Sequence, residues 1–558
     1  MGKKIISFFS QEWNGLHEAA FFLGIFTFLT HLLALFRDRL LAHIFGASQT
    51  LDLYYAAFRI PDFIFAAVAS FISALVIIPI LTRYLIESIE RAQKFINDMF
   101  TVFFTVFIIV SGIVFFFTPE LTRFFFPNFN STQTTELITM TRLLLLSPIL
   151  LGLSNLLGSV TQMFRKFFVF VIAPLLYNIG IIIGALFFYP SFGIIGLAWG
   201  VVLGAFLHFF IQFFVSYRQN FSLEISSRLS FSDLREVMCL SVPRTISLMA
   251  TQATIFALVV FAGTIENGSI TIFNFGFNLG SVPVALIGMS YATAAFPSLS
   301  LFVIRQEMDK FSEQVFSTAQ HIIFWSLPIL TLMIILRAQI VRTVLGSGLF
   351  DWTATKLTAA TFALFAISVP AQSLALLFIR AFYAAGRNKI PFFVSMFSAF
   401  LIIVGGYGFL HFYDQLHFLS NSLESLLHVE GVVGTRVLIL PLVYSLGMLI
   451  HTGLLIYLFY QCFQYPAVSI RKTLMQGLLA TLIGGFVTYQ FLEVLSYFLN
   501  LNSLRGIFLQ GLGAGIAGII TWYIILELLK NEEIQQIRNA FFSKFWKGGV
   551  IIPDKEEI

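Results

Sequence analysis

The chain has 558 residues, of which 58% are hydrophobic and 11% are charged. Soluble domains carry about 25% charged residues, so this composition excludes a soluble protein and indicates one that crosses a membrane many times. The net charge is +5 without a basic patch on a polar segment, so we expect no nucleic-acid binding. Cys239 and Cys462 lie far apart and the histidines lack ligand spacing, so we expect no disulfide, metal or cofactor.

Residues 1–18 form a short amphipathic stretch that we expect at the membrane interface. No apolar stretch there leads to a small-residue cleavage site, so we expect no signal-peptide removal. About fourteen apolar segments follow, and because the alternation of a membrane barrel is absent, we expect them to be helices. The segments cover residues 19–44, 50–83, 99–117, 137–163, 168–190, 193–217, 236–263, 270–303, 317–337, 355–384, 391–413, 432–461, 473–496 and 505–530.

The distribution of Lys and Arg predicts which side of the membrane each loop faces. These residues are most frequent in alternate loops, such as 84–98 and 218–235, and in the tail 531–558. Because cytoplasmic loops carry an excess of Lys and Arg, we expect both termini to be cytoplasmic.

The first twelve segments indicate an internal duplication. Pro79 and Pro297 end the second and eighth segments, and they are separated by nearly the same number of residues as Arg165 and Arg387, which follow the fourth and tenth. We therefore expect an all-α membrane protein with two six-helix lobes in the same sense, related by a pseudo-two-fold axis along the membrane normal. Chance is the alternative, since proline and basic residues are common at helix ends. The expected parts are the interfacial segment 1–18, an N-lobe 19–217, a linker 218–235, a C-lobe 236–461, two further helices 462–530 and a tail 531–558.

The first two segments carry an unusual cluster of charge for a membrane interior. Charged side chains there are costly, so such a cluster marks a candidate functional site. Asp52 and Arg59 are seven residues apart, hence on nearly one helical face, and would pair or orient within a cavity. Two interpretations of the arginines are open. In the structural one, Arg37 only pairs locally with Asp38. In the functional one, Arg37 and Arg59 bind a phosphate or pyrophosphate.

Other features leave alternatives open. Arg244 follows Pro243 deep in a segment, where it could serve the same cavity or only pair with backbone. We expect Arg142 to extend toward the membrane surface. The last two segments, 473–496 and 505–530, would shelter a lipid tail or close the bundle. No catalytic motif stands out, so we expect no enzyme.

Several motifs together resemble the MurJ/MviN lipid II flippases, a family within the larger superfamily of MATE exporters and polysaccharide flippases. The resemblance covers about residues 15–530, and fourteen helices favour this family over its twelve-helix relatives. Asp52 matches an acidic position of the family. The remaining motifs are 33–38 (LALFRD), 44–47 (IFGA), 57–61 (AFRIP), 78–81 (IPIL), 173–178 (APLLYN), 296–300 (FPSLS) and 382–391 (FYAAGRNKIP).

The resemblance implies a flippase for the undecaprenyl-linked peptidoglycan precursor in the bacterial inner membrane, working by alternating access. It also implies cavity arginines that engage the pyrophosphate, and Arg37 and Arg59 match two basic positions. Other family arginines are replaced: His31 stands for one in the first helix and Asn278 for one in the eighth. An arginine pair of the second helix falls near Phe65 and Ala66.

The leading interpretation is therefore a lipid II flippase with membrane lipids and other cell-wall synthesis proteins as partners. Its predicted substrate-binding residues are Arg37, Asp52, Arg59, His31, Arg244 and Asn278. One alternative is a MATE-like or polysaccharide-type exporter, for which Asp52 is the candidate coupling acid. The other is a non-transporting membrane scaffold whose cavity charges have decayed. The energy source stays open among the membrane potential, Na⁺ and H⁺.

Overall fold

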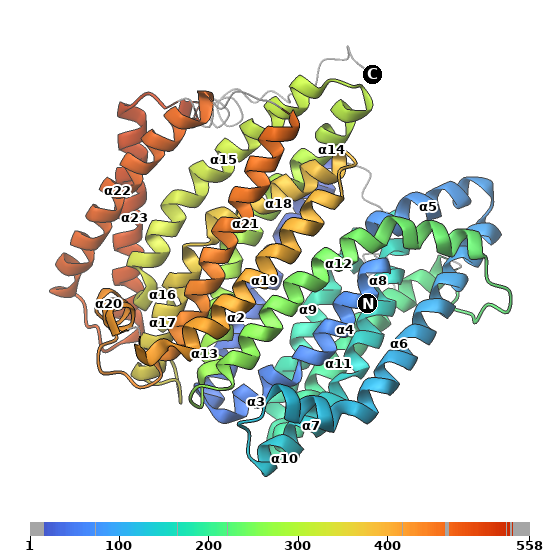
Figure 1. Cartoon of the computed structure of the whole chain (residues 1–558), viewed down its shortest axis with the longest axis horizontal. Helices are drawn as coiled ribbons and strands as arrows, with labels where there is room; N and C mark the ends of the chain where they lie inside the picture. Colours follow the sequence, from blue (N-terminus) through green and yellow to red (C-terminus); the bar gives the residue numbers. More distant parts are fainter. Residues whose placement is uncertain are drawn as a thin grey trace, which may run out of the picture. The chain divides into compact units, whose positions relative to one another are not determined.

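The computed structural model describes residues 16–531, except 73, 165, 220, 416 and 464–467, together with 533–535 and 538. All regular elements in this part are helical (Figure 1). Eleven helices are long and apolar enough to cross a membrane, or twelve if the pair α17 (Trp352–Ala366) and α18 (Val369–Ala384), bent by 41°, is one span. The predicted all-α membrane class is confirmed. The number of spans agrees roughly with the expected fourteen, because the first expected segment carries charge, the second is broken into shorter helices, and neither is counted.

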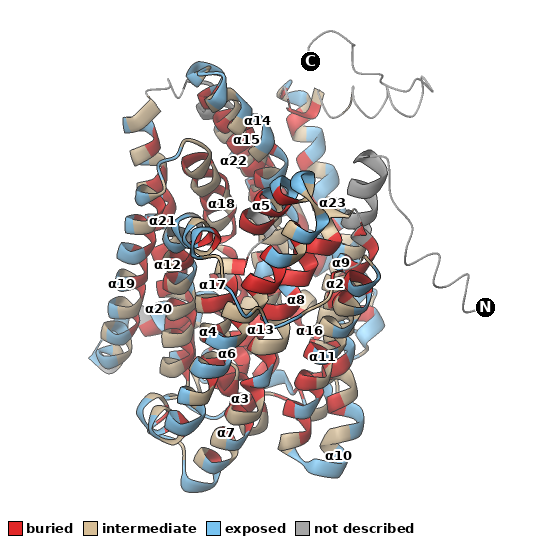
Figure 2. Ribbon diagram, turned by 90° about the vertical axis from the view of Figure 1, so that its right-hand side faces the viewer, coloured by how far each residue is buried: buried red, intermediate tan, exposed pale blue. Residues whose placement is uncertain are grey.

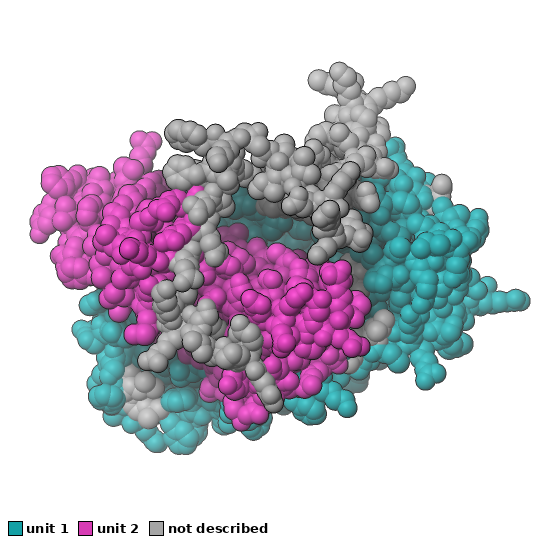
Figure 3. Space-filling model, turned by 90° about the horizontal axis from the view of Figure 1, so that it is seen from above, with its two compact units in different colours: residues 1–279, 344–361, 388–447 teal, residues 280–343, 362–387, 448–558 magenta. Residues whose placement is uncertain are grey.

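Contacts divide the chain into two compact units, coloured separately in Figure 3. Unit 1 comprises residues 1–279, 344–361 and 388–447, and unit 2 comprises residues 280–343, 362–387 and 448–558. The lobe boundaries expected from the sequence stay a prediction. The expected interfacial segment lies outside the described residues up to residue 15, as does the tail from residue 539 onward.

Unit 1 begins with α2 (Leu16–Phe45), followed by a tight turn. Gly46 adopts a φ of 64° in this turn, which favours glycine, and its N–H donates to the Ala42 carbonyl at 2.8 Å. The second expected span is not one continuous helix. It consists of α3 (Gln49–Ala57), α4 (Arg59–Ala69), a short 3₁₀ turn and α5 (Ala74–Glu87).

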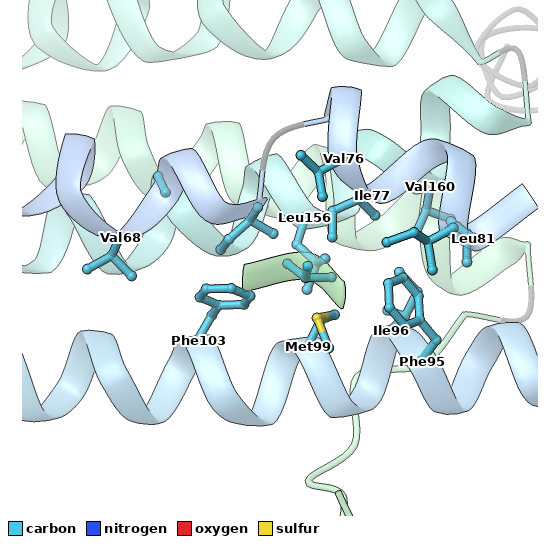
Figure 4. Close-up of a cluster of buried hydrophobic side chains, with 14 of the residues drawn as sticks. Val68, Val76, Ile77, Leu81, Phe95, Ile96, Met99, Phe103, Leu156 and Val160 are labelled. Carbon is cyan, nitrogen blue, oxygen red and sulfur yellow. The ribbon is translucent and has the colours of Figure 1, made fainter. Parts of the chain in front are cut away.

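The next three helices are α6 (Ile89–Phe125), α7 (Ser131–Leu144) and α8 (Leu146–Met163). Asn130 caps α7 in a capping box with Gln133. A cluster of buried apolar side chains joins α4, α5, α6 and α8 (Figure 4). Its labelled members include Val68, Ile77, Phe95, Met99, Leu156 and Val160.

Helices α9 (Phe167–Ile183) and α11 (Ile194–Arg218) pack through glycines. A Cβ added to Gly180 of α9 would collide with the backbone of Gly204 in α11, so only glycine permits this approach. A π-helical turn and the short α10 (Tyr189–Phe192) connect the two helices. The close backbone contact fixes α9 beside α11 and thereby positions the inward face of α9.

Residues 221–230 form a polar strap that runs along α6 rather than a free linker. The Glu224 N–H donates to the Asn97 Oδ1 at 3.2 Å, and the Ser226 N–H donates to the Thr101 Oγ1 at 2.8 Å. The strap leads into α12 (Phe231–Ala262). Hydrogen bonds to α6 thus fix where α12 begins.

Five side chains form what we call the peripheral cluster, at the start of α12: Arg83, Tyr84, Arg91, Asp233 and Glu236. The Arg91 Nη2 donates to both carboxylate oxygens of Asp233, at 3.0 and 2.8 Å, and the Tyr84 hydroxyl donates to Asp233 at 2.8 Å. Arg83 pairs with Glu236 at 2.6 Å. The cluster attaches α12 to α5 and α6.

The rest of unit 1 includes α13 up to residue 279, the start of α17, α19 and α20. In Figure 2 buried and exposed residues alternate along these helices, as expected for helices with one packed face and one outer face. The bounds are Ser269–Pro283 for α13, Lys389–His411 for α19 and His417–Leu427 for α20.

Unit 2 contains the C-terminal helix pair. α22 and α23 pack along each other and α22 also packs on α15, while Trp522 of α23 lies against Phe324 of α15 with ring centroids 4.9 Å apart. His321 of α15 contacts Glu533 at 2.6 Å. The bounds in this unit are Ser290–Ile304 for α14, Met308–Ile335 for α15, Val468–Ser496 for α22 and Leu504–Leu528 for α23. Two further helices cross the boundary between the units: α16 (Arg337–Val344) leaves unit 2 at residue 344, and α21 (Ile439–Phe463) enters it at residue 448.

Candidate functional site

Three charged residues of the first helices, Asp38, Asp52 and Arg59, form hydrogen bonds with one face of α13. Thr271, Asn274 and Asn278 lie three and four residues apart, so they form a single stripe along that helix, which we call the α13 stripe. Their partners are Asp52, Arg59 and the pair of Arg37 with Asp38, described in turn below. All of these residues belong to unit 1.

Asp52 binds the start of α13. Its carboxylate accepts hydrogen bonds from the Gly268 N–H and from both the N–H and the hydroxyl of Thr271, the last two at 2.8 and 2.7 Å. Asp52 is 5% exposed, so it acts as a buried cap supplied by a neighbouring helix. The hydrogen bonds of Asp52 thus go to the start of α13, and not to Arg59 or Arg37 as the expected pairing had it.

Arg59 faces the middle of the α13 stripe. Its Nη2 donates to the Asn274 Oδ1 at 2.7 Å, while its Nε donates to the Tyr55 carbonyl at 3.1 Å. Asp52 and Arg59 thus contact α13 residues three positions apart, as their predicted common face requires. The partners of Arg59 are neutral oxygens, so its charge is not cancelled by a direct hydrogen-bonded carboxylate there.

Arg37 and Asp38 form the local pair that the sequence allowed, but the pair is not isolated. The Arg37 Nε and Nη2 donate to the Asp38 Oδ1 at 3.0 and 2.7 Å, and Nη1 donates to the Asn178 Oδ1 of α9 at 2.9 Å. The other oxygen of Asp38 accepts from the Asn278 Nδ2 at 3.1 Å. One ion pair therefore joins α2, α9 and α13.

Two adjoining cavities lie along these residues. Arg59, Asp62, Asn274 and Asn278 line both of them. The smaller cavity, of about 130 Å³, is also lined by Arg37 together with Tyr54, Tyr55 and Tyr177. The larger one, of about 750 Å³, extends over α4, α8 and α12. This volume falls within the roughly 300–1,000 Å³ of ligand sites in proteins.

The larger cavity is lined by both apolar and polar side chains, and its charge is nearly balanced. Arg59 and Asp62 are the charged members of its lining, and the other polar members are amides and a hydroxyl: Asn155, Gln162, Thr251, Gln252, Asn274 and Asn278. Phe65 and Ala66 line it too, where the resemblance places an arginine pair. Neither side chain adds charge to the cavity.

The other predicted site residues are placed less directly. Asn278 lines both cavities and holds Asp38, so it joins the site in a supporting position. His31 is half-buried on α2, outside the lining of both cavities. The backbone of Arg244 lies in α12, but its side chain is outside the described part of the structure, so its role stays a prediction.

Asp62 and Asn178 belong to the site but are not among the predicted substrate-binding residues. Asp62 is the first acidic residue of α4 and faces both cavities next to Arg59. Its three-residue spacing from Arg59 was a usable signal, since such residues share a helical face. Asn178 gave no such signal, because its contact with Arg37 depends on the packing of α9 against α2.

Comparison with known proteins places the chain in a family. The family model described as "Lipid II flippase MurJ" matches residues 41–508. A protein named "Probable lipid II flippase MurJ" from Buchnera aphidicola subsp. Schizaphis graminum is 26% identical over 68% of this chain and 74% of its own length. Another with that name, from Borreliella burgdorferi, is 23% identical over 83% of this chain and 94% of its own length.

Solved structures agree on the fold. The structure titled "Lipid II flippase MurJ, inward closed conformation" has a TM-score of 0.72 at 19% identity, over 92% of this chain and all of that one. An inward-facing multidrug MATE family transporter has a TM-score of 0.62 at 13% identity, over 80% of this chain and 96% of that one. At these identities the likeness concerns the fold alone. The family match over most of the chain, on a helical fold with a polar cavity beside Arg37 and Arg59, shows that this chain belongs to the MurJ lipid II flippase family.

Proposed function

We propose that this chain translocates lipid II across the cytoplasmic membrane by alternating access, without covalent change to the substrate. The observation that carries the proposal is the position of Arg59. It lines both cavities, and its direct hydrogen-bond partners are neutral oxygens. A guanidinium in this setting can exchange amide contacts for a phosphate oxygen, which it grips in bidentate fashion.

In this proposal each of the two cavities binds a different part of the substrate. Arg37 and Arg59 attract the pyrophosphate at the smaller cavity, and the amides and aromatic rings of the larger cavity contact the sugar and peptide head group. The C-terminal helices α22 and α23 accept the lipid tail. Movement of the N-lobe 19–217 against the C-lobe 236–461 carries the head group across, and both termini face the cytoplasm.

Complementation tests the proposal directly. The chain is expressed in bacteria whose own lipid II flippase can be depleted, and growth is scored with the native chain and with Arg59→Gln. We expect the native chain to restore growth and Arg59→Gln to fail at equal abundance in the membrane. Full growth with Arg59→Gln would remove Arg59 from the transport site.

Asp62 favours a second candidate, a MATE-like exporter that moves a cationic compound. An acid in a cavity with balanced charge can bind a cation, and the arginines lost at Phe65 and Ala66 make the cavity less suited to an anion. Cells expressing the chain would then resist cationic drugs, and Asp62→Asn would abolish that resistance. No change in drug resistance, together with complementation of flippase depletion, excludes this candidate.

A non-transporting scaffold makes the opposite prediction for the cavity charges. Joint neutralisation of Arg37, Arg59 and Arg244 would leave such a protein fully functional in the cell. The lipid II flippase requires the same triple variant to lose complementation. The variant therefore separates the two interpretations whichever single arginine is most important.

A further inference from the structure

A second cavity of unit 1 lies on the outer face of α6, α7, α8 and α11. Its volume is about 680 Å³, and it shares no lining residue with the cavity around Arg59. Most of its lining is apolar, and Ile108, Phe115, Leu146 and Trp199 are each between 41% and 47% exposed. We call it the Arg142 groove, because Arg142 is the charged residue in its lining.

Arg142 is held in the groove by a backbone carbonyl that a proline on the neighbouring helix leaves without its usual donor. Pro119 lies inside α6 and has no N–H for the carbonyl of Phe115, four residues earlier. The Arg142 Nε donates to this carbonyl at 3.0 Å, and its guanidinium lies 4.6 Å from the centre of the Phe115 ring. Among the described residues, the two Nη groups have no hydrogen-bond partner, so two donors remain free for a ligand.

Ser111 provides a second polar group that lacks a partner. It lines the groove one helical turn from Phe115, is 6% exposed, and has an Oγ without a hydrogen-bond partner among the described residues. Ser111 lies one turn further from the 126–130 loop than Phe115, and its Oγ is inaccessible from the groove. The Arg142 Nη groups are therefore the donors that a ligand with oxygen acceptors would meet.

The groove lies within reach of lipid head groups. Arg142 comes six residues after Glu136, the last charge before it in α7, which corresponds to about 9 Å along the helix. Phe115 comes five residues before Glu120 in α6, or about 8 Å. Arginine side chains lean toward the N-terminus of their helix, so Arg142 extends toward the 126–130 loop and the membrane surface beside it.

We propose that the Arg142 groove binds an anionic phospholipid of the leaflet next to the 126–130 loop. The phosphate accepts hydrogen bonds from the Arg142 Nη groups, while an acyl chain lies against Ile108, Leu146 and Trp199. Charge complementarity and the exposed apolar lining favour a membrane lipid over a soluble anion. The site is separate from the proposed transport cavity and does not depend on the transported substrate.

Quenching of Trp199 fluorescence tests the proposal in the full chain. The protein is reconstituted in phosphatidylcholine vesicles with increasing phosphatidylglycerol, and either lipid carries bromine on its acyl chains. The difference between the native chain and Trp199→Phe isolates the signal of the groove from the other tryptophans. We expect about a tenfold preference for phosphatidylglycerol at Trp199, equivalent to about 1.4 kcal/mol.

Variants separate the specific site from general charge effects. Arg142→Gln should lose the preference and Arg142→Lys should keep most of it. Arg123→Gln is the matched control, because this exposed arginine of α6 lies on the same side outside the groove, and it should behave as the native chain does.

Three results would overturn the proposal. The first is equal quenching by both brominated lipids in the native chain, and the second is an unchanged preference in Arg142→Gln. The third is loss of quenching when inorganic phosphate or a polyprenyl phosphate is added at the concentration of phosphatidylglycerol, since the groove would then take a free anion or the transported type of lipid.

Discussion

The α13 stripe and the peripheral cluster show two ways in which unit 1 holds charge. Along the stripe, Arg37 and Asp38 are largely buried, with 19% and 5% of their side chains exposed, and amides of α9 and α13 complete their hydrogen bonds. In the peripheral cluster, Arg83 and Glu236 pair directly and are 51% and 36% exposed. The stripe should therefore be sensitive to single substitutions, and the exposed part of the cluster should not.

The largest effect is expected for Arg37→Ala. It leaves Asp38 buried without its counter-ion, and breaking a buried pair costs about 3–5 kcal/mol. The free energy of unfolding, measured in detergent micelles, should fall by that order. The double variant Arg37→Ala with Asp38→Ala should recover a large part of the loss, and a double variant less stable than the single one would contradict the buried-pair account.

Asp52→Ala should rank second. The substitution leaves the first N–H groups of α13 and the Thr271 hydroxyl without their acceptor, at a cost of about 2 kcal/mol. Unfolding in micelles again provides the measurement. Asp52→Asn keeps one acceptor oxygen and should be milder; if it matched Asp52→Ala, capping of α13 would not be the function of this side chain.

Asp233→Ala tests the buried member of the peripheral cluster. Asp233 is 2% exposed, but Arg91 and Tyr84 can turn to solvent when it is removed, so we expect a loss of about 1 kcal/mol. Hydrogen exchange of the first turns of α12 should rise at the same time. Unchanged exchange would show that the strap along α6 alone fixes the start of α12.

Glu236→Gln should have the smallest effect. Its ion pair with Arg83 is exposed, and such pairs are weakened by solvent and salt. We expect no measurable change in unfolding or in complementation. A clear loss in either measurement would mean that the peripheral cluster acts as one unit and that its difference from the α13 stripe is smaller than described.

The sequence predicted the helical membrane class, because apolar length is a local signal, and its intramembrane charge singled out residues 37–62 as a candidate site. It also predicted that Asp52 and Arg59 share a face, which follows from helical spacing. The partners of these residues could not be predicted. Asn178 and Thr271 meet them only through the packing of α9 and α13, and the acceptor capacity of Asp52 is used by the N–H groups of a helix that begins more than two hundred residues later.

Asp62 and Arg142 illustrate a different limit. The charge of both residues is evident from the sequence, but what each side chain binds depends on its surroundings in the fold. Asp62 faces a cavity in which Arg59 is the other charged residue of the lining, and Arg142 faces a carbonyl that Pro119 leaves free. A missing N–H is visible in a sequence, but the helix that supplies the replacement donor is not.

The central claim is that this chain moves lipid II through the cavity at Arg59. Its most direct test is the fraction of lipid II whose head group is accessible from the outer face of cells in which this chain is the sole flippase. We predict accessible lipid II with the native chain and its loss with Arg59→Gln at equal abundance of protein. Accessibility that is unchanged in Arg59→Gln, or absent with the native chain, would contradict the account.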